Sequence, residues 1–375
     1  MKEDLVLPAT RAAGADAARE PLLSVSGLVK HFPVKGGFPI KRTVGAVQAV
    51  DGLDLTVHAG ESFGLVGESG CGKSTTGRLI TRLLEPTSGT ITYRGRDISH
   101  ATRKQLAPIR SEIQMIFQDP YSSLNPRQTV GKIISGPMEI NGVDPAGGRE
   151  ARVRELLEIV GLNPEHYNRF PHEFSGGQRQ RIGVARALAL EPKLIVADEP
   201  VSALDVSIQA QVVNLLQKVQ NELGIAFVFI AHDLAIVRHF SQRVAVMYLG
   251  KIIEVGDRES IYARPRHPYT HALLSAVPEV TLVEEEAPQR ERIRLAGDVP
   301  SPISPPSGCR FRTRCWKAQD KCAAEEPPLI RLSGNRDGHL TACHFPEEPT
   351  IEARDEDIVL DPALAALEEG NPGAP

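Results

Sequence analysis

Strand-like apolar runs alternate with amphipathic helical stretches through the middle of the chain. The runs lie at 62–66, 194–197 and 226–231 and around Val244. Short apolar runs of this kind are typical of strands buried on both faces of a sheet. Helical periodicity occupies 208–223 and 234–240 between the later runs. Strands that alternate with helices form parallel sheets, so the pattern predicts an α/β core.

Less regular segments surround this core. The part from about Leu22 to Tyr93 is β-rich, whereas 120–171 has helical patches broken by Asn-Pro and Gly-Gly pairs. Beyond Gly256 proline and arginine increase and the apolar periodicity fades. A chain of 375 residues exceeds the usual size of a single core, so more than one domain is expected. Residues 1 to about 20 are Ala-rich with mixed charges and predict a flexible leader.

Composition excludes several classes of protein. No apolar run approaches the ~18 to 20 residues that span a bilayer, and acids follow Met1 where a secretory signal would be apolar. A cytosolic protein is therefore expected. Residues 346–375 hold nine acids and one arginine, so the rest of the chain balances at +4 although the whole carries −4. This acidic end predicts a disordered tail, and the scattered positive charges give no indication of nucleic-acid binding.

The first strand-like run leads into a glycine-rich loop, G-E-S-G-C-G-K-S-T, from Gly67 to Thr75. It fits the phosphate-loop pattern G-x-x-x-x-G-K-[ST], whose glycines let backbone N–H groups cradle phosphate oxygens. The following helix would point the positive end of its dipole at the same anion. Lys73 would reach the β- and γ-phosphates, and Ser74 would ligate Mg²⁺. Many nucleotide-binding families share such a loop; its candidate contacts are Gly67, Ser69, Gly70, Cys71, Gly72, Lys73, Ser74 and Thr75.

Two acids close the apolar run at 194–197. Asp198 stands where a buried strand would reach a catalytic edge, and its carboxylate can hold the shell of Mg²⁺. Glu199 points to the opposite side of the strand line and is placed to take a proton from an attacking water. The alternative is a pair of exposed carboxylates after a strand. The phosphate loop upstream favours ATP hydrolysis.

A third segment, Phe174-Ser175-Gly176-Gly177-Gln178, precedes a basic helical run from Arg179 to Leu190. A hydroxyl and glycine amides at a helix N-terminus suit a γ-phosphate. That phosphate would come from a second subunit, because the phosphate loop already occupies its own side. With this segment the chain resembles ABC-type ATPases, in which it is the signature motif. The resemblance implies a head-to-tail dimer whose sites are completed by Ser175, Gly176, Gly177 and Gln178.

The resemblance carries over to four further places. Gln118 looks like the glutamine that senses Mg²⁺ and the membrane partner, and Ser202 to Asp205 looks like the loop that crosses the dimer interface. His232 looks like the histidine that contacts the γ-phosphate; without the neighbouring motifs it would be a core or edge histidine. Phe32 stands where the family stacks an aromatic ring on adenine, although a core phenylalanine is the alternative and residues 33–45 blur the spacing.

The stretch Arg266-His267-Pro268-Tyr269-Thr270 resembles the C-terminal extension of ATPases that serve oligopeptide and dipeptide importers. The resemblance covers roughly 22–345. It implies an ABC-type nucleotide-binding domain with a parallel RecA-like core, an antiparallel β subdomain and an inserted helical subdomain, followed by a small Cys-containing extension. The expected boundaries are 1–21 for the leader, 22–256 for the ATPase with its helical subdomain at about 119–178, 257–345 for the extension, and 346–375 for the tail.

Four cysteines lie in this extension, at Cys309, Cys315, Cys322 and Cys343. A cytosolic chain rarely keeps such cysteines as disulfides, and four thiolates suffice for a metal site. Their spacing, C-x5-C-x6-C-x20-C, matches neither zinc knuckles nor common ferredoxins. The resemblance implies a [4Fe–4S] cluster, with zinc or no metal as alternatives. Three nearby arginines, Arg310, Arg312 and Arg314, are expected to offset the charge of the thiolates.

The motifs predict an ATP-hydrolysing, Mg²⁺-dependent protein, and the resemblance implies that it is a subunit of an importer of short peptides, peripheral on the cytoplasmic face of the membrane. The resemblance implies as partners two permease subunits, a second ATPase subunit that is a homologue, and indirectly a substrate-binding protein. Related importers of nickel, glutathione or another small solute are alternatives. A DNA-repair ABC ATPase is disfavoured because only 125 positions separate Lys73 from Asp198, with no long coiled coil between them.

Overall fold

The computed structural model describes residues 20–36, 42–119, 123–276, 292–333, 335–336 and 338–348. In these residues eight strands form one mixed sheet in the order β11-β12-β10-β9-β3-β8-β7-β6. The strands β9, β3, β8, β7 and β6 pair with one another in parallel, as the sequence predicts for the core. Their bounds are Arg243–Tyr248, Ser62–Val66, Ala226–Ala231, Leu194–Asp198 and Ile113–Ile116.

Both faces of this sheet are covered, which explains the uninterrupted apolar runs. In β8, Phe227 and Phe229 pack into one hydrophobic cluster and Val228 and Ile230 into another. Successive side chains of a strand point to opposite faces, so each cluster lies on its own side of the sheet. Helix α1 (Lys73–Ile80) packs on one face, with α2 (Arg103–Glu112) beside β6, and α8 (Leu234–Phe240) and α7 (Val206–Leu223) cover the other.

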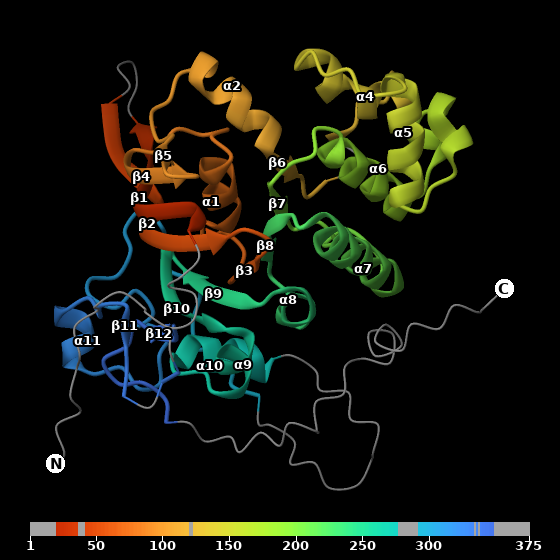
Figure 1. Ribbon diagram of the computed structural model, residues 1–375. Helices are drawn as coiled ribbons and strands as arrows, with labels where there is room; N and C mark the ends of the chain where they lie inside the picture. Colours follow the sequence, from red (N-terminus) through yellow and green to blue (C-terminus); the bar gives the residue numbers. More distant parts are fainter. Residues whose placement is uncertain are drawn as a thin grey trace, which may run out of the picture.

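A second, antiparallel sheet lies beside the phosphate-loop end of the core (Figure 1). Its order is β2-β1-β4-β5, from β1 (Pro21–Gly36), β2 (Arg42–His58), β4 (Ser88–Tyr93) and β5 (Arg96–Asp97). This sheet corresponds to the antiparallel β subdomain that the family resemblance implies, and it lies in the β-rich N-terminal part. The pairing of β1 with β2 places Phe32 opposite Val47.

A helical lobe projects to one side of the core (Figure 1). It comprises α4 (Val130–Ile140), α5 (Gly148–Ile159), the short helices η2 (Pro164–Asn168) and η3 (Pro171–Glu173), and α6 (Gly176–Leu188). Buried Val153, Leu156 and Leu157 of α5 face this lobe's interior. The helices α4, α5, η2 and η3 lie within about 119–178, where the sequence predicts a helical insertion, whereas α6 continues to Leu188.

The C-terminal part continues the core sheet instead of forming a detached unit. Strand β10 (Lys251–Asp257) pairs with β9 on one side and with β12 (Leu340–Thr341) on the other, and β12 pairs with β11 (Ile330–Arg331). Buried Glu254 of β10 links the core sheet to the C-terminal extension. Its carboxylate accepts hydrogen bonds from the backbone N–H groups of Arg266 and His267 and lies 2.8 Å from Nε2 of His339.

Three short helices complete this part: α9 (Arg258–Ala263), α10 (Pro268–Ser275) and α11 (Asp320–Ala324). The extension lies on the other side of the core from the helical lobe (Figure 1). Most of the expected leader and tail, 1–19 and 349–375, falls outside the described residues. Among the residues that the structure does describe, none of the helices combines the length and apolarity needed to cross a bilayer.

Candidate nucleotide site

The loop from Gly67 to Thr75 connects β3 to α1, and its shape depends on glycine. Gly67 and Gly72 have φ of 154° and 110°. A Cβ at Gly67 would lie 2.2 Å from the carbonyl oxygen of Met247, and one at Gly72 would lie 2.0 Å from that of Ala49. Any other residue would therefore displace the loop from β9 or β2. Cys71 is buried beneath the loop, and burial raises the pKa of its thiol.

Lys73 and Ser74 begin α1 at the end of the loop. The buried Lys73 ammonium donates to the carbonyl oxygens of Gly67 (2.8 Å) and Glu68 (3.0 Å). The Ser74 hydroxyl donates to Oδ1 of Asp198, the last residue of β7, at 2.7 Å. Burial raises the pKa of Asp198 although the Ser74 hydrogen bond lowers it.

A hydroxyl and a carboxylate held together are hard oxygen donors of the kind that Mg²⁺ prefers. Protein sites for Mg²⁺ supply few ligands, and water and substrate phosphates supply the rest. Ser74 and Asp198 therefore fit a Mg²⁺ ion that accompanies ATP, and such an ion would neutralise charge on the phosphates.

Glu199 lies just beyond β7 in an unusual backbone conformation. Its φ is 46°, in the left-handed region, which costs a non-glycine residue about 1–3 kcal/mol and recurs at functional sites. Its amide still donates to the Ile230 carbonyl at 2.9 Å, so β8 holds the turn. The carboxylate accepts from Nε2 of Gln118 at 2.9 Å and lies 3.4 Å from Nδ1 of His232. Three separately predicted side chains thus meet at one point.

One cavity joins these groups. It is lined by Phe32, Val47, Ala49, Ser69, Gly70, Gly72, Lys73, Ser74, Thr75, Gln118, Glu199, His232 and Pro302. Gly67, Cys71 and Asp198 are not among the lining residues but contact Lys73 or Ser74, which are. The positions predicted from the phosphate loop and the acid pair therefore converge here, together with Phe32, Gln118 and His232.

Sequence reasoning missed three lining residues. Val47 and Ala49 point from β2 toward the cavity, and their alternation with Gln48 is the only signal that the sequence offers. Pro302 comes from the C-terminal extension, and no motif marks it. Phe32 is 36% exposed and lines the cavity, which disfavours the alternative that it is a core residue.

The signature segment stands apart from this cavity. Ser175 is the N-cap of α6: its hydroxyl accepts the Gln178 amide at 3.4 Å, and its own amide donates to the Gln178 side chain at 3.1 Å. A Cβ at Gly177 would lie 2.4 Å from Cγ2 of Ile208, so this glycine lets α6 approach α7. Gly176 is the first residue of α6. None of 175–178 lines the cavity of its own chain.

The four cysteines come together, although they are spread over the extension. Cys309, Cys315, Cys322 and Cys343 line one small cavity with His267, Phe311 and other residues. Burial raises the pKa of Cys309 to about 11 and that of Cys343 to about 12. Within the described ranges, no group of three or more His, Cys, Asp or Glu side chains has an arrangement that would hold a metal ion.

The expectation that three arginines offset the thiolates is wrong for two of them. Arg314 pairs with Glu68 at 2.8 Å, and Arg310 pairs with Asp51. Both carboxylates lie outside the cysteine cavity, so these guanidinium charges are neutralised elsewhere. Only Arg312 lines the cavity, and its hydrogen bonds go to Ser307.

A phosphate loop, an Mg²⁺-compatible pair and a carboxylate held by glutamine and histidine define an ATP-hydrolysing enzyme. Comparison with solved structures agrees. The ATP-binding cassette MJ0796, described as dimeric in a post-hydrolysis state bound to ADP and Pi, is 28% identical and covers 63% of this chain and 98% of its own, with a TM-score of 0.55. The cbiO1 protein of Clostridium perfringens, part of an ABC transporter complex, is also 28% identical, covering 65% and 92%, with a TM-score of 0.55. The chain is an ABC-type ATPase.

Sequence comparison places it more narrowly. Residues 50–202 match the family described as ABC transporter, and residues 253–322 match the family described as oligopeptide/dipeptide transporter, C-terminal region. The oligopeptide transport ATP-binding protein AppF of Bacillus subtilis is 50% identical over 88% of this chain and 98% of its own. The dipeptide transport ATP-binding protein DppF of Haemophilus influenzae is 50% identical over 86% and 96%. This chain belongs to the family of oligopeptide and dipeptide transport ATP-binding proteins.

Proposed function

We propose that this chain is the ATP-hydrolysing subunit that energises import of oligopeptides or dipeptides across the cytoplasmic membrane. The observation that carries the proposal is the match of 253–322 to the oligopeptide/dipeptide C-terminal region, on a chain whose cavity brings the phosphate loop together with Gln118, Glu199 and His232. Similarity to AppF and DppF over 88% and 86% of this chain supports the same substrate class. We assign the ATPase to 22–256, with its helical subdomain at about 119–178, and the extension to 257–345.

Each residue of the cavity has a role in this proposal. Lys73 binds the β- and γ-phosphates, Ser74 and Asp198 hold Mg²⁺, and Phe32 stacks on adenine. Glu199 takes the proton of the attacking water, because its carboxylate faces the cavity and is oriented by Gln118. His232, whose Nδ1 lies 3.4 Å from the Glu199 carboxylate, steadies the γ-phosphate.

Two such chains, or this chain and a homologue, form the working ATPase. The N-terminus of α6 presents the hydroxyl of Ser175 and the amides of Gly176 and Gly177, but it lies outside its own cavity. Free amides at a helix N-terminus bind anions, so these groups suit a γ-phosphate bound by the partner. The loop from Ser202 to Asp205 precedes α7 and would cross the same interface.

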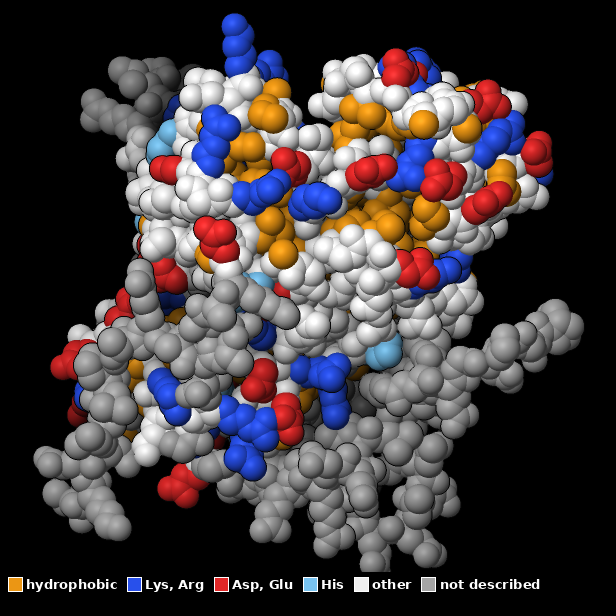
Figure 2. Space-filling view, viewed as in Figure 1, with side chains coloured by type: hydrophobic (Ala, Val, Ile, Leu, Met, Phe, Trp, Pro, Cys, Tyr) orange, Lys and Arg blue, Asp and Glu red, His pale blue; other side chains and the backbone are white. Residues whose placement is uncertain are grey.

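Separate permease subunits supply the membrane pathway in this proposal, and the chain binds them from the cytoplasmic face. Figure 2 shows hydrophobic side chains gathered in the hollow between the helical lobe and the rest of the core. Phe117, beside Gln118, is 37% exposed. A permease segment that docks near Gln118 would be linked to Glu199 by one hydrogen bond. A substrate-binding protein would deliver the peptide to the permeases.

The cysteine cavity belongs to the proposal as well. Four thiols that line one small cavity are of the donor type that an iron–sulfur cluster needs, with zinc as the alternative metal, although the described side chains are not arranged as metal ligands. When bound, such a group would cross-link a region with few regular elements. Anaerobically purified protein should contain iron and sulfide, and Cys309→Ser should lose both, whereas Cys71→Ser should keep them. Wild-type protein without iron, sulfide or visible absorption would refute the cluster, and stoichiometric zinc would identify the alternative.

The transport proposal is tested by gentle, oxygen-free purification of the tagged chain from native membranes. Recovery of two permeases, with or without a sister ATPase, is the expected result. Recovery of nucleic-acid machinery without a membrane subunit would contradict import while leaving ATP hydrolysis intact.

A further inference from the structure

Two arginines link the cysteine cavity to the nucleotide cavity. Arg310 directly follows Cys309, and Arg314 directly precedes Cys315. Neither side chain turns toward the thiols: each pairs with a carboxylate of the ATPase core, and the side chains of both are only 9% exposed. A buried guanidinium must be paired and hydrogen-bonded, so both contacts constrain the structure around them.

At the phosphate end, the contact is with Glu68 of the phosphate loop. Nη1 of Arg314 donates to the Glu68 carboxylate at 2.8 Å, and the amide of Glu68 donates to the hydroxyl of Tyr269 in α10 at 2.9 Å. The carbonyl of the same residue accepts from Nζ of Lys73 at 3.0 Å. The extension therefore holds the backbone that places the phosphate-binding lysine.

Buried aromatic packing fixes the arginine loop at this end. Phe311, three residues before Arg314, is fully buried against Tyr248 of β9 and Tyr269, with ring centroids 5.3 Å apart in each pair. The loop between the first two cysteines is thus fixed to the core as well as to Glu68.

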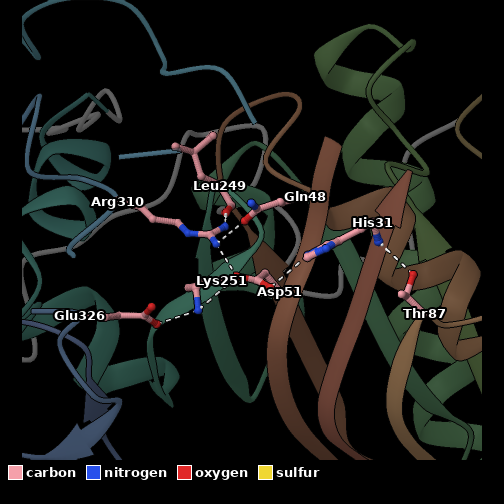
Figure 3. A network of polar contacts seen from close by, with 8 residues as sticks. All are labelled: His31, Gln48, Asp51, Thr87, Leu249, Lys251, Arg310 and Glu326. Carbon is pink, nitrogen blue, oxygen red and sulfur yellow. Dashed lines mark hydrogen bonds and ion pairs between the residues drawn. The ribbon is translucent and has the colours of Figure 1, made fainter. Parts of the chain in front are cut away.

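On the side of the cavity proposed to bind adenine, Arg310 contacts residues of β2 (Figure 3). Figure 3 shows the Arg310 guanidinium reaching the Leu249 carbonyl, the Gln48 side chain and Asp51. Asp51 also lies near Lys251 and His31, and Lys251 bonds Glu326 of the extension.

Gln48 is held by the extension at its backbone too. Its amide donates to the carbonyl oxygen of Pro302 at 2.9 Å, and Oε1 accepts from Arg310 at 2.8 Å. Its neighbours Val47 and Ala49 line the nucleotide cavity, and so does Pro302 itself. A shift of the extension would therefore move one wall of the cavity directly.

We propose that Arg310 and Arg314 are positioning residues for nucleotide binding, through which the structural state of the four-cysteine module sets the affinity for ATP. Arg314 holds the phosphate loop at Glu68, and Arg310, with Pro302, holds the wall formed by β2. Neither touches a reacting atom. The inference rests on the proposed nucleotide cavity.

The test measures ATP and ADP affinity in single variants with a matched control. Arg310→Gln and Arg314→Gln are each expected to raise the Kd for both nucleotides about tenfold, equivalent to about 1.4 kcal/mol. Arg312→Gln serves as the control, because Arg312 lies on the same loop and its side chain hydrogen-bonds Ser307 instead of a carboxylate of the ATPase core. It is expected to change Kd less than about twofold. Arg314→Lys, which keeps the charge, should recover most of the affinity.

A double-mutant cycle separates positioning from general loss of stability. Once Arg314→Gln is present, adding Glu68→Gln should weaken binding little further, because the two residues act through one contact. Cys315→Ser should raise Kd to a similar extent, and much less in the Arg314→Gln background. Additive effects of Arg314→Gln and Glu68→Gln, or wild-type Kd values in both arginine variants, would overturn the inference.

A further variant distinguishes this failure from failure of the nucleotide site. Lys73→Ala should abolish measurable ATP binding. If Lys73→Ala binds ATP normally, the cavity itself is wrongly assigned. If Lys73 is required but Arg310 and Arg314 are not, the cavity stands and only the positioning role is lost.

Discussion

Replacing Glu199 by glutamine tests whether this carboxylate is the general base, because the substitution changes one oxygen atom of the side chain to an NH₂ group. The substitution keeps the size of the side chain and a carbonyl oxygen that can accept from Gln118, which lies 2.9 Å from the present carboxylate. It removes the group that can take a proton. ATP binding should therefore survive, because Lys73, Ser74 and Phe32 are untouched.

The expected loss follows from general-base catalysis. A positioned base contributes about 10²- to 10⁴-fold, so turnover should fall by this factor. Each factor of ten corresponds to about 1.36 kcal/mol, and the barrier should rise by about 2.7–5.4 kcal/mol. Phosphate release measures turnover, and equilibrium binding of ATP measures the ground state.

Glu191→Gln provides a matched control. Glu191 also has a left-handed backbone, with φ of 52°, and its side chain is 78% exposed near Arg152. Exposed pairs contribute little, so this variant should keep wild-type turnover. Turnover of Glu199→Gln within about threefold of wild type would refute the assignment of the base. Loss of ATP binding would mean instead that Glu199 holds the site together.

Two further predictions concern stability. Gly177→Ala should lower the free energy of unfolding by about 1–3 kcal/mol, because the new Cβ would lie 2.4 Å from Cγ2 of Ile208. Adding Ile208→Ala should restore much of this loss in thermal melts, and a double variant that is no more stable would show that the strain lies elsewhere. For Asp51, burial raises the pKa of the carboxyl group, but the charges of Lys251 and Arg310 outweigh burial and lower this pKa overall. The stability that the Asp51 carboxylate contributes is therefore complete above about pH 4, the pKa of an unfolded aspartate, and is lost as pH falls through the lower pKa of the folded state. Asp51→Asn should accordingly lower Tm at neutral pH and flatten its decline below about pH 4, and parallel curves for the two proteins would contradict this.

The sequence predicts the core well because local patterns decide it. Residues 62–66, 226–231 and 234–240 form the expected elements with the expected bounds. Strands buried on both faces leave an uninterrupted apolar signal, and the capped N-terminus of α6 carries its own serine and glutamine. The phosphate loop is likewise local, since its glycines, lysine and serine are adjacent along the chain.

What the sequence could not predict depends on contacts between distant segments. Pro302 lines the nucleotide cavity although it lies more than two hundred residues beyond the phosphate loop, and its residue type gives no indication of this position. The partners of Arg310 and Arg314 were misjudged for the same reason. Their closeness to cysteines in the sequence favoured charge compensation of thiolates, whereas the fold brings Asp51 and Glu68 within reach.

The left-handed backbone of Glu199 is a third feature beyond the reach of sequence. Strand alternation places the side chain opposite that of Asp198, but only the structure shows the turn with φ of 46° that brings it to Gln118 and His232. That a glutamate adopts a left-handed backbone conformation cannot be predicted from its residue type.

Peptide uptake tests the central claim most directly. Cells that lack this chain would be supplied with the wild-type protein or with Glu199→Gln at equal abundance, and accumulation of labelled dipeptides and oligopeptides would be followed. The account predicts that the wild-type protein restores uptake and that Glu199→Gln does not. Peptide uptake that is the same with wild-type protein, with the variant and with neither would contradict it.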